Sequence, residues 1–200
     1  MPDPIEKQYV KHPYPLPIHD MAERLKSGTH KEASGLDLVW NKLFPEKVYS
    51  DQLDVLIAGC GTNQAVYHAL KFPSSNYYAI DVSQTSIDHV KKMIKMYDIK
   101  NLDVERREIE DLTEEKAFDY VISINTVHNL ELEECEIAIK EIQRVCKKNS
   151  FITVDAFRND EEKERMYKWN LTAKTILSVN DWKALFKKIN YKGDYYWFIP

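Results

Sequence analysis

Residues 53–63 read LDVLIAGCGTN, and this stretch decides the fold. Its first seven residues form an apolar run that ends in Gly59, which is typical of a strand buried on both faces of a parallel sheet. Gly59 and Gly61 then let the backbone turn tightly and approach a ligand without Cβ collisions. The stretch therefore predicts a buried strand followed by a tight turn that faces a ligand.

Strands and helices alternate in the rest of the chain. Further strands are predicted at 76–82, 102–109, 118–124, 150–157 and 195–199, and helices at 64–71, after Ser83, at 131–145 and after Asn180. Such alternation produces right-handed crossovers and a parallel sheet. We predict an α/β fold, a Rossmann-like three-layer αβα sandwich with a mostly parallel sheet of about six to seven strands. Ligands bind beyond the carboxyl ends of strands in such sheets.

The first 48 residues have a different pattern. PYPLP at 13–17 favours an extended path, because proline fixes its own φ and restrains the residue before it. An amphipathic helix is expected around residues 36–43, ending near Pro45. Residues 1–48 are thus predicted to be an arm and a helix that belong to the same domain as the main body, residues 49–200.

Composition limits the classes of partner. The chain has 200 residues with a formal net charge of −4, which argues against nucleic acid as the main partner. No stretch approaches the roughly 20 apolar residues that span a bilayer, and MPDPIEKQYVKHPYP lacks the apolar core of a signal peptide. Three cysteines without a Cys-x-x-Cys pair indicate free thiols, so a cytoplasmic location is expected.

An acidic residue follows the second predicted strand. Asp81 lies 20 positions after Gly61, where a carboxylate can accept hydrogen bonds from both hydroxyls of a ribose. The dinucleotide fingerprint requires Gly or Ala where this chain has Gln64, so a nicotinamide dinucleotide is disfavoured. The pattern predicts an adenosine-type cofactor; the alternative is a tight turn beside a solvated carboxylate.

Four ordered motifs carry a resemblance to a known family. VLIAGCGTN, AIDVSQTSIDHVKKM, REIEDL and FDYVISINTVHNL resemble the motifs of class I S-adenosylmethionine-dependent methyltransferases over roughly residues 53–155. The resemblance implies methyl transfer, with S-adenosylmethionine as cofactor and S-adenosylhomocysteine as product. The implied cofactor residues are Ala58, Gly59, Cys60, Gly61 and Asn63 under the methionine part, Asp81 at the ribose, Val82, Glu108 and Ile109 around the adenine, and Asn125 at the methionine end.

The chain departs from the family pattern at several places. Ala58 stands where the family usually has an acidic residue, so a backbone carbonyl or Asn125 would have to replace one ligand of the methionine amine. Asn63 stands where a third glycine is usual, and the final antiparallel hairpin is missing. The carboxylate set of the metal-dependent subgroup is incomplete at Asn125 and Asp155, so no metal is predicted. Asp155 is interpreted as a strand-end hydrogen-bonding residue or a substrate contact.

Three residues are catalytic candidates. His128 is the candidate base, because an unperturbed imidazole titrates near neutral pH, at about 6.5; packing or capping of the following helix is the alternative. The leader QYVKHPYPLP at 8–17 resembles Tyr-Pro-rich leaders that fold over the site as a lid in this family. Tyr9 and Tyr14 would then donate hydrogen bonds to cofactor or substrate, or pack as an apolar arm.

Other readings remain open from the sequence. Arg158 is expected to form a surface ion pair with the acidic run at 160–164, with an anionic substrate group as the alternative. A small-molecule acceptor, methylated on oxygen or nitrogen by a monomer or homodimer, is the leading interpretation. The rivals are an NAD-dependent oxidoreductase, a non-catalytic cofactor-binding or interaction protein, and a methyltransferase acting on protein or RNA.

Overall fold

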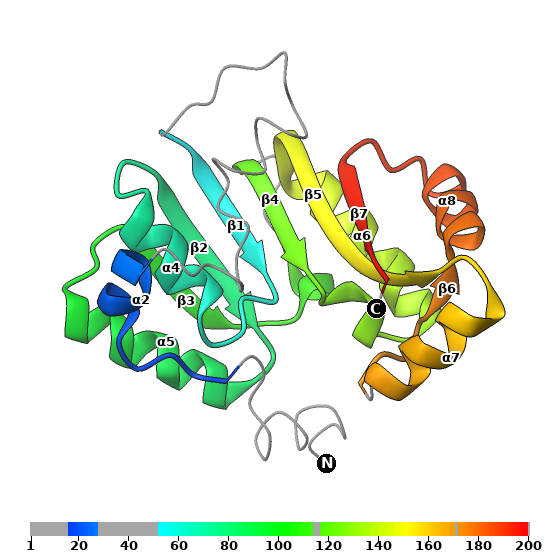
Figure 1. The fold of residues 1–200 in the computed structure, drawn as a ribbon. Helices are drawn as coiled ribbons and strands as arrows, with labels where there is room; N and C mark the ends of the chain where they lie inside the picture. Colours follow the sequence, from blue (N-terminus) through cyan, green and yellow to red (C-terminus); the bar gives the residue numbers. More distant parts are fainter. Residues whose placement is uncertain (1–15, 28–51, 114–116, 171, 200) are drawn as a thin grey trace. The chain divides into compact units, whose positions relative to one another are not determined.

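The computed structural model describes residues 16–27, 52–113, 117–170 and 172–199 (Figure 1). The chain forms two compact units, Met1–Glu108 and Ile109–Pro200, and each is described by itself. The expected helix around 36–43, together with Tyr9 and Tyr14, lies outside the described residues. In the described parts of the chain, no helix combines the length and hydrophobicity needed to cross a membrane.

Three parallel strands form the sheet of the first unit. They are β1 (Asp54–Ala58), β2 (Asn76–Asp81) and β3 (Leu102–Arg106), with β2 in the middle. The side chains of Val55 to Ala58 are fully buried, as the apolar run predicted. Ala58 pairs with Ile80, so the turn that follows β1 lies beside the carboxyl end of β2. The predicted strand over 102–109 is shorter than expected, because β3 ends at Arg106.

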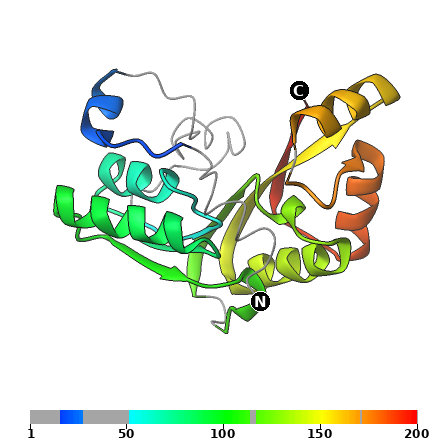
Figure 2. The same ribbon diagram turned by 90° about the horizontal axis from the view of Figure 1, so that it is seen from below.

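Two helices pack side by side against these strands, α4 (Gln64–Lys71) and α5 (Gln84–Tyr97) (Figures 1 and 2). α4 has the predicted bounds, and α5 begins directly after Ser83 as predicted. Ser83 caps α5 by accepting a hydrogen bond from the Ser86 backbone N–H. A third helix, α2 (Met21–Ser27), contacts α4 and was not predicted.

Four strands belong to the second unit, and β5 (Cys146–Phe157) is its centre. β4 (Phe118–Ile124) pairs with one edge of β5 and β7 (Asp194–Phe198) with the other, while β6 (Leu177–Ser178) pairs with its last residues. Each of these pairings is parallel. The last predicted strand therefore exists, and it lies beside β5 as a parallel neighbour.

Three helices accompany these strands: α6 (Leu132–Val145), α7 (Asp160–Trp169) and α8 (Val179–Lys188). A capping box of Glu131 and Glu134 starts α6, close to the predicted boundary. The predicted cap of α8 is wrong: Ser178 caps it, and Asn180 lies inside the helix. The described residues contain seven strands flanked by helices, which confirms the predicted Rossmann-like α/β class.

Candidate functional site

The glycine turn after β1 is fastened to the end of β2. The backbone N–H groups of Gly59 and Cys60 both donate to the carbonyl of Ile80, over 2.9 and 3.0 Å. Gly59 has φ 80° and Gly61 has φ 55°, values that residues with a Cβ rarely adopt. These φ values favour glycine at both positions, and the two hydrogen bonds to Ile80 hold the turn against β2.

Asp81 braces this turn from the carboxyl end of β2. Its Oδ2 accepts a hydrogen bond from the Gly61 N–H and its Oδ1 one from the Ser83 N–H, both over 2.8 Å. Burial raises the pKa of the Asp81 carboxyl, and the two N–H donors partly offset that rise. Each oxygen keeps a second lone pair, so the carboxylate can still accept bonds from two ribose hydroxyls. Val82 follows it, and the Val82 carbonyl accepts from Arg106 Nε over 3.0 Å.

Two side chains of the turn offer no polar contact to a ligand. Ala58 is completely buried. The Cys60 side chain is 2% exposed, and burial followed by the nearby Asp81 charge raises the pKa of its thiol well above the usual value. A thiol that stays protonated and buried is a packing group, so these two residues can contribute to a ligand only through their backbone.

Asn63 has its side chain occupied by another part of the same unit. Its Oδ1 accepts from the Ile18 backbone N–H and its Nδ2 donates to the Leu16 carbonyl, each over 2.9 Å. The φ of Asn63 is −121°, which any residue can adopt, so the backbone does not require the usual glycine here. The sequence indicated that Asn63 was unusual, but nothing in the local pattern pointed to a partner 45 residues away.

Glu108 and Ile109 were predicted around the adenine. Glu108 is exposed and ends the first unit, whereas Ile109 is 6% exposed and begins a 3-10 turn, η1 (Ile109–Asp111), in the second. Their environments therefore differ: one side chain is in contact with solvent and the other packs in the interior of its unit.

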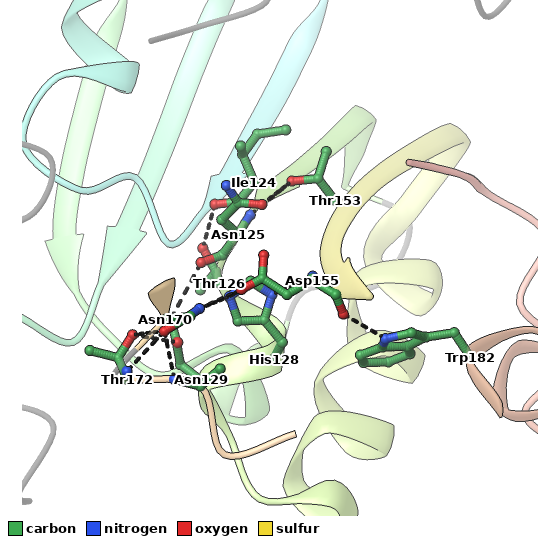
Figure 3. Close-up of polar contacts among 11 residues, drawn as sticks. Ile124, Asn125, Thr126, His128, Asn129, Thr153, Asp155, Asn170, Thr172 and Trp182 are labelled. Atoms are coloured by element: carbon green, nitrogen blue, oxygen red, sulfur yellow. Dashed lines mark hydrogen bonds and ion pairs between the residues drawn. The ribbon is translucent and has the colours of Figure 1, made fainter. Parts of the chain in front are cut away.

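Asn125 follows β4 in a left-handed conformation, with φ 52°. Thr153 of β5 holds it from both ends (Figure 3): Oγ1 accepts from the Asn125 N–H over 2.9 Å and donates to Asn125 Oδ1 over 2.8 Å. Because the hydroxyl occupies the amide oxygen, Nδ2 is the group of Asn125 that can donate a hydrogen bond to a ligand. That nitrogen has no hydrogen-bond partner among the described residues of its unit.

His128 lies in a short turn, η2 (Val127–Asn129), and its side chain is 1% exposed. Nδ1 accepts a hydrogen bond from the Asp155 backbone N–H over 3.1 Å, so the proton of the neutral ring sits on Nε2. Nε2 lies 3.7 Å from Asp155 Oδ2. Burial lowers the pKa of the imidazole to about 4. The ring is therefore neutral at physiological pH, and its one acceptor atom is already used.

Asp155 and Asn170 complete a buried polar cluster with His128 (Figure 3). The Asn170 amide is oriented by the N–H groups of Thr172 and Ala173, which donate to Oδ1 over 2.8 and 3.0 Å, so Nδ2 donates to Asp155 Oδ2. The other carboxylate oxygen, Oδ1, is buried and has no hydrogen-bond partner among the described residues of this unit. Burial raises the pKa of Asp155 to about 6. Asn170 carried no sequence signal for this role, because its partners Asp155 and His128 lie 15 and 42 residues away.

The structure thus gathers the predicted residues into two clusters, one in each unit. Gly59, Gly61, Asn63 and Asp81 meet at the carboxyl ends of β1 and β2, whereas Asn125 and His128 lie at those of β4 and β5. Arg158 forms the expected ion pair with the acidic run, through Glu162. Within the described segments, no three His, Cys, Asp or Glu side chains are grouped to hold a metal ion.

Both a family model and several solved structures resemble this chain. A family model described as a methyltransferase domain matches residues 49–194. YcgJ of Bacillus subtilis has 16% sequence identity and a TM-score of 0.58, and the match covers 74% of this chain and 66% of that one. The [4+2]-cyclase SpnF has 18% identity and a TM-score of 0.58, with 76% and 56% covered.

A third solved structure covers more of the chain. It is a complex between the Trm112 methyltransferase activator and a putative methyltransferase of Haloferax volcanii, with 13% identity, a TM-score of 0.61, and 94% of this chain and 76% of that one covered. At such identities these likenesses show the fold alone, and the chain spans less than two thirds of YcgJ and SpnF. Because the family model spans well over half of the chain, the protein belongs to the methyltransferase domain family, the class I S-adenosylmethionine-dependent methyltransferases that its motifs indicated.

Proposed function

We propose that the protein transfers a methyl group from S-adenosylmethionine to a small-molecule acceptor, on oxygen or nitrogen, by in-line displacement. The observation that carries the proposal is the braced turn: the Asp81 carboxylate holds both Gly61 and Ser83 and still has acceptor capacity for a ribose. The fold leaves the chemistry open, because a cyclase shares it. Family membership favours methyl transfer.

The residues of the first unit fit an adenosine ligand. Asp81 would accept hydrogen bonds from the ribose hydroxyls, with Val82 beside the adenine. The turn from Ala58 to Asn63 would offer backbone groups to the methionine part, since its side chains are apolar, buried or occupied. Glu108, Ile109 and Asn125 remain proposed cofactor residues. The cofactor supplies an activated methyl group, so the protein mainly has to orient the acceptor, which can contribute about 7–11 kcal/mol.

The geometry around Asn125 favours one of its proposed contacts. Thr153 fixes the amide oxygen, so the free Nδ2 donates hydrogen bonds, and a donor suits a carboxylate or carbonyl rather than an ammonium. We therefore propose that Asn125 binds an acceptor group of the ligand. A backbone carbonyl is left to bind the methionine amine in place of the side chain that Ala58 lacks.

For His128 the geometry favours the structural role over the proton-accepting role. A general base needs a free lone pair within reach of the substrate, and here Nδ1 is taken by the Asp155 N–H while the ring is buried. We propose that His128 orients residues 172–175, because its backbone carbonyl also accepts from the N–H groups of Lys174 and Thr175. Tyr9 and Tyr14 stay the candidates for contacts to the acceptor.

A thermal-shift titration with S-adenosylhomocysteine, with NADH in parallel, tests the proposal. At about 100 times Kd a single-site ligand stabilises by roughly 2.7 kcal/mol, which is a rise of about 5–10 °C in Tm. Asp81→Ala should weaken binding at least tenfold, because each hydrogen bond to a charged group is worth about 1.5–3 kcal/mol. Asp103→Ala, at an exposed position of β3, is the matched control and should bind normally.

The alternatives predict other results. A rise in Tm with NADH alone would favour the oxidoreductase alternative. No rise in Tm with either ligand at millimolar concentration would refute the cofactor assignment. Binding of S-adenosylhomocysteine without turnover on any acceptor would support the non-catalytic reading. Size-exclusion chromatography with light scattering distinguishes the proposed monomer from a homodimer, and fractionation tests the proposed cytoplasmic location.

A further inference from the structure

Segment 16–27 is held against the first unit by a side chain of the glycine turn. Both polar atoms of the Asn63 side chain bond to this segment. Oδ1 accepts a hydrogen bond from the Ile18 N–H and Nδ2 donates one to the Leu16 carbonyl, both over 2.9 Å. Asn63 is 3% exposed, so its amide lies in the interior, where a hydrogen bond is stronger than in water. An amide that binds both a backbone donor and a backbone acceptor of the same segment fixes the position of that segment.

Helix α5 provides a second anchor for the same segment. Tyr97 Oη accepts hydrogen bonds from the N–H groups of Met21 and Ala22, over 2.9 and 3.4 Å, and so caps the start of α2. The centre of the His89 ring lies 5.7 Å from the centre of the His19 ring. The hydrogen bonds of Tyr97 and the ring contact of His89 are made to this segment.

Asn63 also belongs to the ligand-facing turn. It follows Gly61 and Thr62 and is the residue before α4, yet its side chain makes no capping bond to that helix. The Gly61 N–H two residues earlier is bound by Asp81. A ligand that binds this turn therefore contacts the stretch of backbone that includes Asn63, and the Asn63 side chain holds segment 16–27 in place.

We propose that Asn63 couples the docking of segment 16–27 to ligand binding on the glycine turn. This rests on the proposed function, because it takes an S-adenosylmethionine-type ligand to be the occupant of the turn. Coupling between two sites is reciprocal in binding free energy. The ligand therefore makes the segment dock more firmly, and the docked segment makes the ligand bind more tightly. Asn63 is a positioning residue in this scheme.

The test measures both directions with S-adenosylhomocysteine on the full chain. Hydrogen–deuterium exchange follows the amides of residues 16–27, and calorimetry gives Kd. In the parent protein the ligand should slow exchange of this segment. Asn63→Gly and Tyr97→Phe should each speed exchange without ligand and raise Kd by about fivefold or more, the lower end of typical couplings. Lys91→Ala, exposed on α5, is the control and should change neither quantity.

Tyr97→Phe is the decisive variant, because it loosens the segment without altering the turn. If it binds S-adenosylhomocysteine as tightly as the parent while Asn63→Gly binds weakly, Asn63 acts only locally and the coupling is refuted. Unchanged exchange in the parent on adding ligand refutes it as well. Both results leave the proposed function intact, whereas a parent protein that does not bind S-adenosylhomocysteine overturns the proposed function and the coupling together.

Discussion

At the scale of single residues, the second cluster depends on one hydroxyl. Asn125 holds a left-handed conformation, which costs energy for any residue with a side chain and is tolerated best by asparagine and aspartate. Thr153 compensates by bonding both the backbone N–H and the amide oxygen of Asn125. The two hydrogen bonds stabilise an uncommon backbone conformation at the end of β4. Because they also occupy the Asn125 amide oxygen, they leave Nδ2 as the free group of that side chain.

Thr153→Val tests this arrangement. Valine keeps the shape but loses the hydroxyl, so the Asn125 amide oxygen loses its donor and the N–H keeps only the longer bond to the Thr153 carbonyl, 3.2 Å. We expect the free energy of unfolding to fall by about 1–2 kcal/mol in urea denaturation. Thr153→Ser keeps the hydroxyl and removes only one methyl group, so its free energy of unfolding should fall less than that of Thr153→Val. A larger loss for serine than for valine would mean that packing, and not the hydroxyl, matters here.

At the scale of secondary-structure elements, the boundary of α8 shows how side-chain chemistry chooses between neighbouring candidates. Asn180 and Ser178 are both residues that can cap a helix. Ser178 takes the position because its Oγ accepts from the Asp181 N–H over 3.1 Å and lies 2.6 Å from Asp181 Oδ2, a second contact. Asn180 is exposed in the first turn, where it has no capping role.

The two residues should therefore respond differently to the same substitution. Ser178→Ala removes the cap and should cost about 1 kcal/mol in the free energy of unfolding, measured in urea. Asn180→Ala replaces a poor helix former with the best one at an exposed site, so it should be neutral or stabilise by a few tenths of a kcal/mol. The reverse order of the two effects would restore Asn180 as the cap.

Helix α7 shows why one element escaped the sequence analysis. Met166 is its only buried apolar residue, so it has no apolar stripe at helical spacing. It is started by Asn159, whose side chain accepts from the Glu162 N–H, and braced by the Arg158–Glu162 ion pair. Strands β1 and β4 were predictable for the opposite reason, because burial on both faces leaves a continuous apolar run.

At the scale of the whole chain, the sequence predicted the order of six strands and four helices, together with the residues that follow the strand ends, but it missed α2, α7 and β6. Gly59, Gly61 and Asp81 were predictable because turn conformation and ligand chemistry restrict those positions locally. The role of Asn63 and the contact of Asn170 with Asp155 were not, since each depends on a partner distant in sequence that only the folded chain brings near. Long-range polar pairs have no periodicity that a sequence pattern could reveal.

The buried pair of His128 and Asp155 should make the stability of the protein depend on pH. The pKa of His128 falls to about 4 in the fold, against about 6.5 in an unfolded chain, so its neutral form is favoured by folding. Stability from this group is fully present above pH 6.5 and is lost as pH falls through 4. At about 1.4 kcal/mol for each pH unit, the loss approaches roughly 3 kcal/mol. Asp155 has the opposite effect on stability. Burial raises its pKa to about 6, so its protonated form is favoured by folding, and its contribution to stability increases as pH falls.

His128→Asn separates the two contributions. Asparagine cannot titrate, and its Oδ1 can replace Nδ1 as acceptor for the Asp155 N–H, while Asp155 remains in both proteins. The variant should be less stable than the parent at pH 7.5, since imidazole packing is lost, but its free energy of unfolding should fall less between pH 7 and 4.5. Urea denaturation across that range measures the difference. Parallel pH curves would mean that His128 is not a buried neutral ring, and the base role at the end of β4 would then become the better explanation of this residue.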